Sequence, residues 1–147
     1  MGKVAPAFTL PDQDGNTWSS ATLSGRPYVL YFYPKDDTTG CTKEACGVRD
    51  HYAEFRAKGV PVFGVSADGV ASHRKFADKY NLPFPLLADP ERRIIEAYGA
   101  WREKSMYGRT YMGIQRMTVI VGADGRIVKE WPKVSPEGHA EEILASL

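Results

Sequence analysis

Residues 27–46, PYVLYFYPKDDTTGCTKEAC, contain a strand signal, a turn signal and both cysteines of the chain. The first eight residues are a continuous apolar and aromatic run between two prolines, which is typical of a strand buried on both faces. We expect a helix to follow, from about Cys41 to about Lys58. Because a buried strand that leads directly into a helix begins a parallel βαβ arrangement, this stretch predicts an α/β protein.

Strand and helix signals alternate on the C-terminal side of this stretch. Two more buried-strand signals occur, each followed by a helical pattern: VPVFGVSAD (60–68), SHRKFADKY (72–80), FPLLADP (84–90) and ERRIIEAYG (91–99). Alternation of this kind predicts parallel strands joined by helices.

Antiparallel strands are predicted at both ends of the chain. Residues 116–121 and 126–131 are strand signals joined by Asp124-Gly125, which predicts a hairpin and makes the sheet mixed. Residues 7–18 predict a short strand and an Asp-Gly turn. The predicted fold class is therefore α/β, a central mixed sheet flanked by helices with an N-terminal β extension, in one domain of residues 1–147.

Two further segments complete the prediction. Ser135 is expected to be the N-cap and Pro136 the first residue of a last helix that runs to Leu147. Residues 101–112, WREKSMYGRTYM, are rich in aromatic residues and methionine, and we expect them to pack over the sheet.

The length, composition and net charge of the chain exclude several classes of function. The chain has 147 residues, 43% hydrophobic and 25% charged, as in one ordinary globular domain. Nineteen Lys and Arg against eighteen Asp and Glu leave a formal charge of +1, too little to attract nucleic acid or an anionic membrane. No apolar run approaches the roughly 18 residues of a membrane span, and the first residues lack secretory-signal features. We therefore expect a cytoplasmic protein.

The two cysteines are too far apart for a disulfide within a regular helix. On an ideal helix Cys46 lies about 140° around from Cys41 and about 7.5 Å further along the axis, so their Cα atoms would be about 8.7 Å apart. A disulfide needs less than about 7 Å. If the two cysteines bond, the first turn of the helix must unwind.

Cys41 is expected to be nucleophilic because it stands where the helix begins. Free N–H groups and the positive end of the helix dipole favour a thiolate there. Gly40 permits close approach of a ligand to the backbone, and the Thr38 hydroxyl can donate to an anion or a peroxide oxygen. The residues alone also leave open a simple helix cap followed by an inert, buried cysteine.

The segment YPKDDTTGCTKEACGVRD, residues 33–50, resembles the active-site segment of the atypical 2-Cys peroxiredoxins called peroxiredoxin Q or bacterioferritin comigratory protein. It includes the Pro-x-x-x-Thr-x-x-Cys motif at Pro34, Thr38 and Cys41. The resemblance extends through APAFTLPDQDG, FGVSAD, KYNLPFPLLAD and MYGRTYMGIQRMTVIV, and so covers nearly the whole chain. It implies a thioredoxin-like fold and a thiol-dependent peroxidase.

The resemblance also implies roles for the site residues. Cys41 would be the peroxidatic cysteine, and the Thr38 hydroxyl would hold the peroxide and the thiolate. Pro34 would shape the floor of the pocket. Arg116 would stabilise the thiolate and the departing oxygen, with Glu44 orienting the guanidinium.

By the same resemblance, Cys46 would be the resolving cysteine, and a thioredoxin-like reductant would restore the dithiol. Hydrogen peroxide and organic hydroperoxides are the implied substrates, a monomer is expected, and no metal, haem or flavin is implied. One departure is that Thr39 replaces the proline of the usual Thr-Pro-Gly-Cys. Because proline would fix φ before the nucleophile, a looser loop or competition between Thr39 and Thr38 as the cap is expected.

Other sites can be built from the same residue types. A metal site would use Cys41, Cys46 and some of His51, His73 and His139, but the splay of the two cysteines opposes shared coordination. A Cys-His hydrolase would leave His51 about 15 Å from the nucleophile, and we expect the other two histidines to be solvated or capping. A thioredoxin-type oxidoreductase needs Cys-x-x-Cys. A non-catalytic binding module of the same fold remains an alternative.

Overall fold

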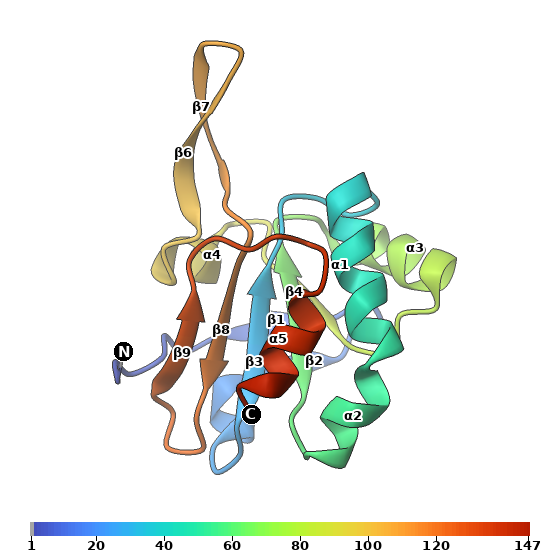
Figure 1. The fold of residues 1–147 in the computed structure, drawn as a ribbon, viewed down its shortest axis with the longest axis vertical. Coiled ribbons are helices and arrows are strands. Elements are labelled where there is room, and N and C mark those ends of the chain that lie inside the picture. The colour runs from blue at the N-terminus through green and yellow to red at the C-terminus, as the bar shows by residue number, and fades with distance from the viewer. Residues whose placement is uncertain (1) are drawn as a thin grey trace.

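A computed structural model describes residues 2–147 and has a five-stranded central sheet (Figure 1). The strand order is β5-β4-β3-β8-β9, with bounds Tyr28–Phe32 (β3), Val62–Ser66 (β4), Leu86–Ala88 (β5), Met117–Val121 (β8) and Ile127–Trp131 (β9). The first three strands are parallel, whereas β8 pairs antiparallel with β3, and β9 with β8. The predicted mixed α/β sheet is confirmed.

The middle of the sheet consists of strands that are buried along their whole length. Every residue of β3, β4 and β8 is buried. In the register, Leu30 of β3 lies opposite Phe63 on one side and Val119 on the other. Because β3 is paired on both edges and covered on both faces, the chain segment that leaves it starts from a fixed position.

Two apolar clusters cover the two faces of the sheet, and alternate residues of β3 point into each. The first face is covered by α1 (Thr39–Asp50), α2 (Tyr52–Ala57), α3 (Val70–Tyr80) and α5 (His139–Ala145). The second face is covered by α4 (Arg93–Ala97), the 3-10 helix η1 (Ser20–Leu23) and the predicted N-terminal extension, a hairpin of β1 (Thr9–Pro11) and β2 (Thr17–Ser19).

The single helix predicted from Cys41 to about Lys58 is instead two helices, α1 and α2, separated at His51. The Nδ1 atom of His51 lies 2.9 Å from the Gly47 carbonyl oxygen, the acceptor that the His51 backbone N–H would use in a continuous helix. That N–H donates to the Val48 carbonyl at 3.2 Å. The imidazole thus takes the place of the backbone donor, and α1 ends there.

The last helix is shorter than predicted. It spans His139–Ala145, so the predictions of Ser135 as its N-cap and Pro136 as its first residue are wrong. The residues before this helix instead cross the end of the sheet, where the Val134 N–H donates to the carbonyl oxygen of Arg116 at 3.1 Å. A glycine with φ of 73° then turns the chain into the helix.

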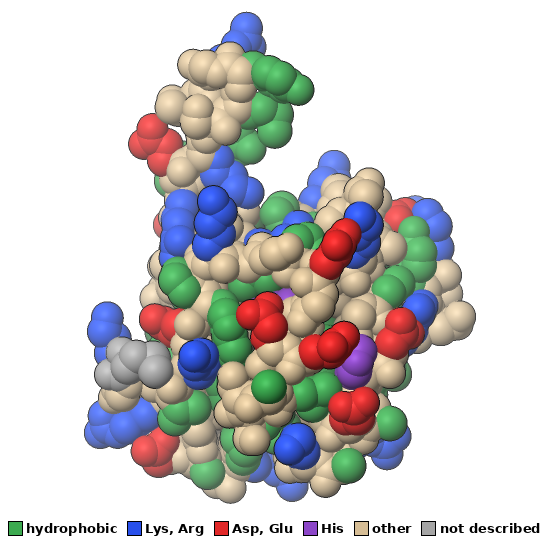
Figure 2. Space-filling view, in the orientation of Figure 1, with side chains coloured by type: hydrophobic (Ala, Val, Ile, Leu, Met, Phe, Trp, Pro, Cys, Tyr) green, Lys and Arg blue, Asp and Glu red, His purple; other side chains and the backbone are tan. Residues whose placement is uncertain are grey.

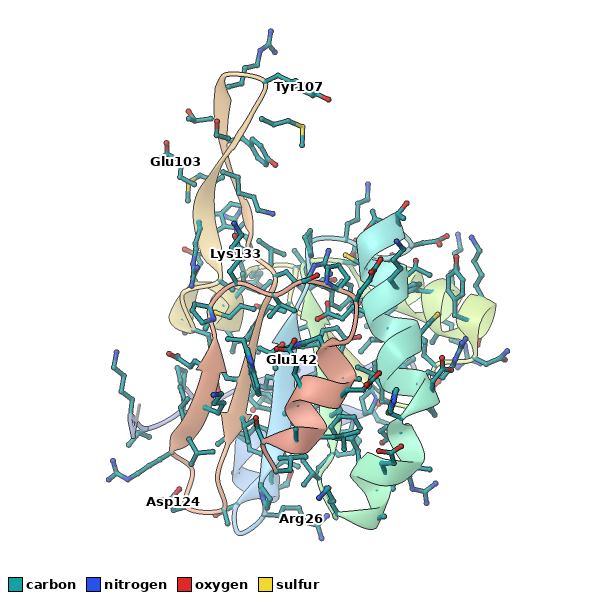
Figure 3. All side chains as sticks on the ribbon, viewed as in Figure 1. Arg26, Glu103, Tyr107, Asp124, Lys133 and Glu142 are labelled. Atoms are coloured by element: carbon teal, nitrogen blue, oxygen red, sulfur yellow. The ribbon has the colours of Figure 1, made fainter. Side chains whose placement is uncertain are left out.

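Apart from Trp101, which packs against the cluster of the second face, the segment 101–112 does not pack over the sheet, so that prediction is wrong for most of the segment. It lies in a hairpin of β6 (Trp101–Met106) and β7 (Arg109–Ile114) that projects away from the rest of the molecule (Figure 1). Tyr107 and Gly108 at the turn have φ of 52° and 77°, as a two-residue type I′ hairpin turn requires. Tyr107 is 97% exposed and points outward at the tip (Figure 3).

Basic and acidic side chains are interspersed on the face of the molecule drawn in Figure 2, in keeping with the nearly balanced charge of the sequence. Within residues 2–147, no helix combines the length and the apolar character needed to cross a bilayer.

Candidate active site

The candidate nucleophile lies where the chain leaves β3 and enters α1. Cys41 is the third residue of α1, is 1% exposed and packs in the apolar cluster of the first face. Thr38 is the N-cap residue, with extended φ and ψ. Because the first N–H groups of a helix have no acceptor within it, the amides of Gly40 and Cys41 are available to an anion at this end.

The register of the sheet brings Arg116 to this cysteine. Arg116 immediately precedes β8, and the pairing of Phe32 with Met117 sets the start of β8 beside the end of β3. Its Nη2 atom lies 3.4 Å from Cys41 Sγ, and its Nη1 donates to Glu44 Oε1 at 2.8 Å. The structure therefore brings the predicted cation, the predicted nucleophile and the predicted orienting carboxylate together.

Glu44 is a buried carboxyl group in the same helix as Cys41. Its side chain is 1% exposed, and its Oε2 atom has no hydrogen-bond partner among the described residues. Burial raises the pKa of Glu44 from its usual 4.5 to about 7, although the charge and hydrogen bond of Arg116 oppose this shift. One carboxyl oxygen thus holds the guanidinium, and the group changes protonation state near neutral pH.

Gly40 leaves the space that the guanidinium occupies. A Cβ atom added to Gly40 would lie 3.0 Å from Arg116 Nη2 and 3.4 Å from Pro136 Cγ. The sequence predicted that this glycine admits a ligand to the backbone. In the structure it also admits Arg116 and Pro136, a role that cannot be read from the local sequence because both partners lie far along the chain.

Thr38 is exposed, and its hydroxyl donates to the carbonyl oxygen of Lys35 at 2.9 Å. The Oγ1 atom keeps its acceptor lone pairs. Thr39 is the exposed first residue of α1, so Thr38 is the N-cap by position, although it makes no side-chain cap bond. Pro34 is half-buried in the loop between β3 and α1.

Cys46 is half-buried on α1, and both cysteines are free thiols. The helix Thr39–Asp50 is continuous between them. A disulfide between Cys41 and Cys46 therefore requires part of α1 to unwind, as the sequence predicted from the spacing.

The expectation that His73 and His139 are solvated or capping is wrong. His73 is fully buried, with Nδ1 2.7 Å from Asp36 Oδ2. His139 is 1% exposed, with Nε2 2.8 Å from Thr118 Oγ1. Neither partner is near in sequence, so the helical pattern around each histidine held no sign of it.

Among residues 2–147, the potential metal-ligating side chains that lie within 4.8 Å of one another are Asp36, Asp68 and His73, a group that contains neither cysteine. The sequence reasoning missed this group. The signal that could have indicated it is an aspartate that follows a buried strand by only a few residues, since such a carboxylate lies near the sheet end.

A family model described as AhpC/TSA matches residues 1–130. The chain is 46% identical over its whole length to a putative peroxiredoxin bcp of Coxiella burnetii, of which it covers 97%. It is 43% identical, again over its whole length, to peroxiredoxin Bcp of Bacillus subtilis, of which it covers 94%. The chain belongs to the AhpC/TSA family, as a Bcp-type peroxiredoxin.

The fold of this peroxiredoxin is similar to the solved structure of Xanthomonas campestris bacterioferritin comigratory protein, with a TM-score of 0.90 and 36% identity over 95% of this chain and 88% of that one. The thioredoxin-like α/β fold expected from the sequence is confirmed. As a peroxiredoxin the chain is an enzyme, a thiol peroxidase, which sets aside the hydrolase, the disulfide oxidoreductase and the non-catalytic module.

Proposed function

We propose that this peroxiredoxin reduces hydroperoxides by attack of the Cys41 thiolate on the terminal peroxide oxygen. The observation that carries the proposal is the 3.4 Å contact between Arg116 Nη2 and Cys41 Sγ at the start of a helix. A guanidinium and free amides at one sulfur favour its anionic form, which is the nucleophile. The same donors are suited to the negative charge that grows on the departing oxygen.

In this step an S–O bond forms and the O–O bond breaks. Cys41 is oxidised to a sulfenic acid, and the peroxide is reduced to water or to an alcohol after the leaving oxygen takes a proton. The Thr38 hydroxyl and the amides of Gly40 and Cys41 hold the two peroxide oxygens in line with the sulfur. Pro34 bounds the pocket, and Glu44 fixes the guanidinium of Arg116.

Cys46 then resolves the sulfenic acid. Its thiolate attacks Cys41 Sγ, water leaves, and an intramolecular disulfide forms after the start of α1 unwinds. A thioredoxin-like dithiol reduces this disulfide and so closes the cycle. We place the cycle in a single domain of a cytoplasmic monomer.

Both hydrogen peroxide and organic hydroperoxides are proposed as substrates. The Xanthomonas campestris relative is described in terms of alkyl peroxide reduction, and it shares 36% identity with this chain. The exposed position of Thr38 at the helix start is compatible with a substrate that carries an alkyl group.

Two cysteine variants test the proposal. Cys41→Ser should abolish peroxide consumption. Cys46→Ser should consume one equivalent of peroxide and then lose recycling by a thioredoxin-like reductant. Equal and nearly complete activity of both variants would overturn the assignment of the two roles.

A further inference from the structure

A buried carboxylate and a buried histidine meet beneath the loop that precedes the peroxidatic helix. Asp36 is 8% exposed and His73 is 0% exposed, and Asp36 Oδ2 lies 2.7 Å from His73 Nδ1. Asp36 also accepts from the Tyr33 hydroxyl at 2.6 Å and from the Ser72 hydroxyl at 2.8 Å. Three donors around one carboxyl group match its ionised, acceptor-only form.

The ring of His73 faces an acceptor on each side. Nδ1 faces Asp36, and Nε2 lies 2.9 Å from the carbonyl oxygen of Leu87 in β5. With Asp36 ionised, both contacts are hydrogen bonds at once only if both ring nitrogens carry a proton, since a neutral imidazole has one donor. The geometry thus fits a buried imidazolium paired with a carboxylate. Removing one partner of such a pair strongly destabilises the folded state.

The backbone around Asp36 is tied to the same side of the molecule. The Asp36 N–H donates to Asp68 Oδ2 at 2.8 Å, after the end of β4. The next residue, Asp37, has φ of 57°, and its carboxylate accepts from Lys79 at 2.8 Å and from the Tyr80 hydroxyl at 2.9 Å. The side chains of Asp36 and Asp37 therefore fasten the loop of residues 34–38 to α3 and to the sheet end. Its last residue, Thr38, is the N-cap of α1, and its carbonyl oxygen accepts from the Thr42 N–H at 2.8 Å.

The same three side chains, Asp36, Asp68 and His73, have the spacing of a cation site. Both ring nitrogens of His73 are already within hydrogen-bond distance of protein acceptors, and Asp68 Oδ2 already accepts from the Asp36 amide and the Ser66 hydroxyl. These contacts fasten a loop and leave no free ring nitrogen for an ion.

We propose that Asp36 and His73 are positioning residues that hold the 34–38 loop, and with it Thr38 and the start of α1, in the geometry for peroxide attack at Cys41. This inference rests on the proposed role of Cys41. The pair supplies the rigidity that the family's proline would give at position 39, where this chain has threonine. It also lets α1 unwind for the disulfide while the loop stays in place.

Asp12 provides a matched control. It is 4% exposed and, like Asp36, accepts three hydrogen bonds, from the amides of Asp14 and Asn16 and from the Trp18 indole. It lies in the N-terminal hairpin on the other side of the sheet. Asp12→Asn should therefore lower thermal stability as Asp36→Asn does, without moving the 34–38 loop.

The test measures the second-order rate constant of Cys41 oxidation by hydrogen peroxide in a Cys46→Ser background, with Tm alongside. Asp36→Asn and His73→Gln should each lower it by about tenfold or more, because a misplacement of about 1 Å can cost 10²-fold. The double variant should be no slower than the slower single variant, and Asp12→Asn should stay within about twofold of the parent. Unchanged rates in both single variants, or an equal loss in Asp12→Asn at equal Tm, would overturn the proposal.

A second measurement does not depend on the folding of variants. Nitrogen-15 NMR of the unaltered protein at neutral pH should show a proton on both ring nitrogens of His73, and a neutral ring would overturn the ion pair. If instead the parent fails to oxidise at Cys41, the proposed function fails and the NMR result still stands by itself.

Discussion

The guanidinium of Arg116 lies 3.4 Å from the sulfur of Cys41, although the two residues are 75 positions apart in the chain. The same guanidinium is held by Glu44 at 2.8 Å through its other terminal nitrogen. A planar guanidinium whose two terminal nitrogens each contact a fixed partner has little freedom to move away from the sulfur. This relationship links the sheet register to the proposed chemistry, since the arginine immediately precedes β8 and the thiol lies in α1.

Arg116→Ala should slow the oxidation of Cys41 by hydrogen peroxide about 10²-fold or more, as expected for loss of one transition-state donor. Arg116→Lys should recover only part of the rate, because a lysine ammonium cannot contact Glu44 and Cys41 at the same time as the two terminal nitrogens of a guanidinium do. Stopped-flow tryptophan fluorescence measures the rate. The surface variant Arg126→Ala should match the parent, and a parent-like rate for Arg116→Ala would contradict the role of the arginine.

Gly40→Ala should slow the same step by about tenfold, because the new Cβ would stand 3.0 Å from Arg116 Nη2 and the guanidinium must shift. Gly47→Ala in the same helix is the control, since nothing lies within 4 Å of its added Cβ. It should keep the rate and gain about 0.5–1 kcal/mol of stability from helix propensity. Equal rates for the two alanine variants would show that the space at Gly40 does not matter.

Stability should depend on pH through Glu44. Its pKa is raised in the folded protein from the usual 4.5 to about 7, chiefly by burial, so the folded state binds the proton more tightly than the unfolded state. The free energy of unfolding contributed by this group is therefore highest below pH 4.5 and falls as the pH rises to about 7. The loss amounts to up to about 3.5 kcal/mol, because one pKa unit corresponds to about 1.4 kcal/mol.

Urea unfolding of the parent and of Glu44→Gln across pH 5 to 8 measures this effect. The variant lacks the titration, so its stability relative to the parent should increase with pH. Parallel pH curves for the two proteins would contradict the assigned protonation of Glu44.

Oxidation should unwind the start of α1. Amides of residues 42–46 should exchange with solvent faster in the disulfide form than in the dithiol form, because the wound helix holds the two cysteines too far apart to bond. Hydrogen exchange with mass spectrometry measures this. Peroxide-treated Cys46→Ser is the control and should keep its protection, whereas equal protection in the disulfide form would rule out the unwinding step.

The sequence predicted the parts of the fold that depend on local pattern. The buried run at residues 28–32 and the Asp124-Gly125 turn specify β3 and the β8–β9 hairpin through hydrophobicity and turn chemistry alone. The resemblance to a family, and not the pattern, picked out Arg116. Its contact with Cys41 depends on strand register, which no single segment encodes.

The predictions from the sequence were wrong where a contact with a distant residue competes with a local signal. The His51 side chain displaces a backbone donor and ends α1. The pairing of Val134 with Arg116 draws in residues that would otherwise start α5. Residues 101–112 contain the Tyr-Gly pair that forms the turn, but their richness in aromatic residues and methionine suggested burial. His73 pairs with the carboxylate of Asp36, which lies 37 positions away in the chain.

The most direct test is the intact mass of the fully reduced protein after one equivalent of hydrogen peroxide, followed by mapping of the modified peptide. We predict the loss of two hydrogens and a single linkage between Cys41 and Cys46. An unchanged mass, or an added oxygen on any residue other than Cys41, would contradict the account.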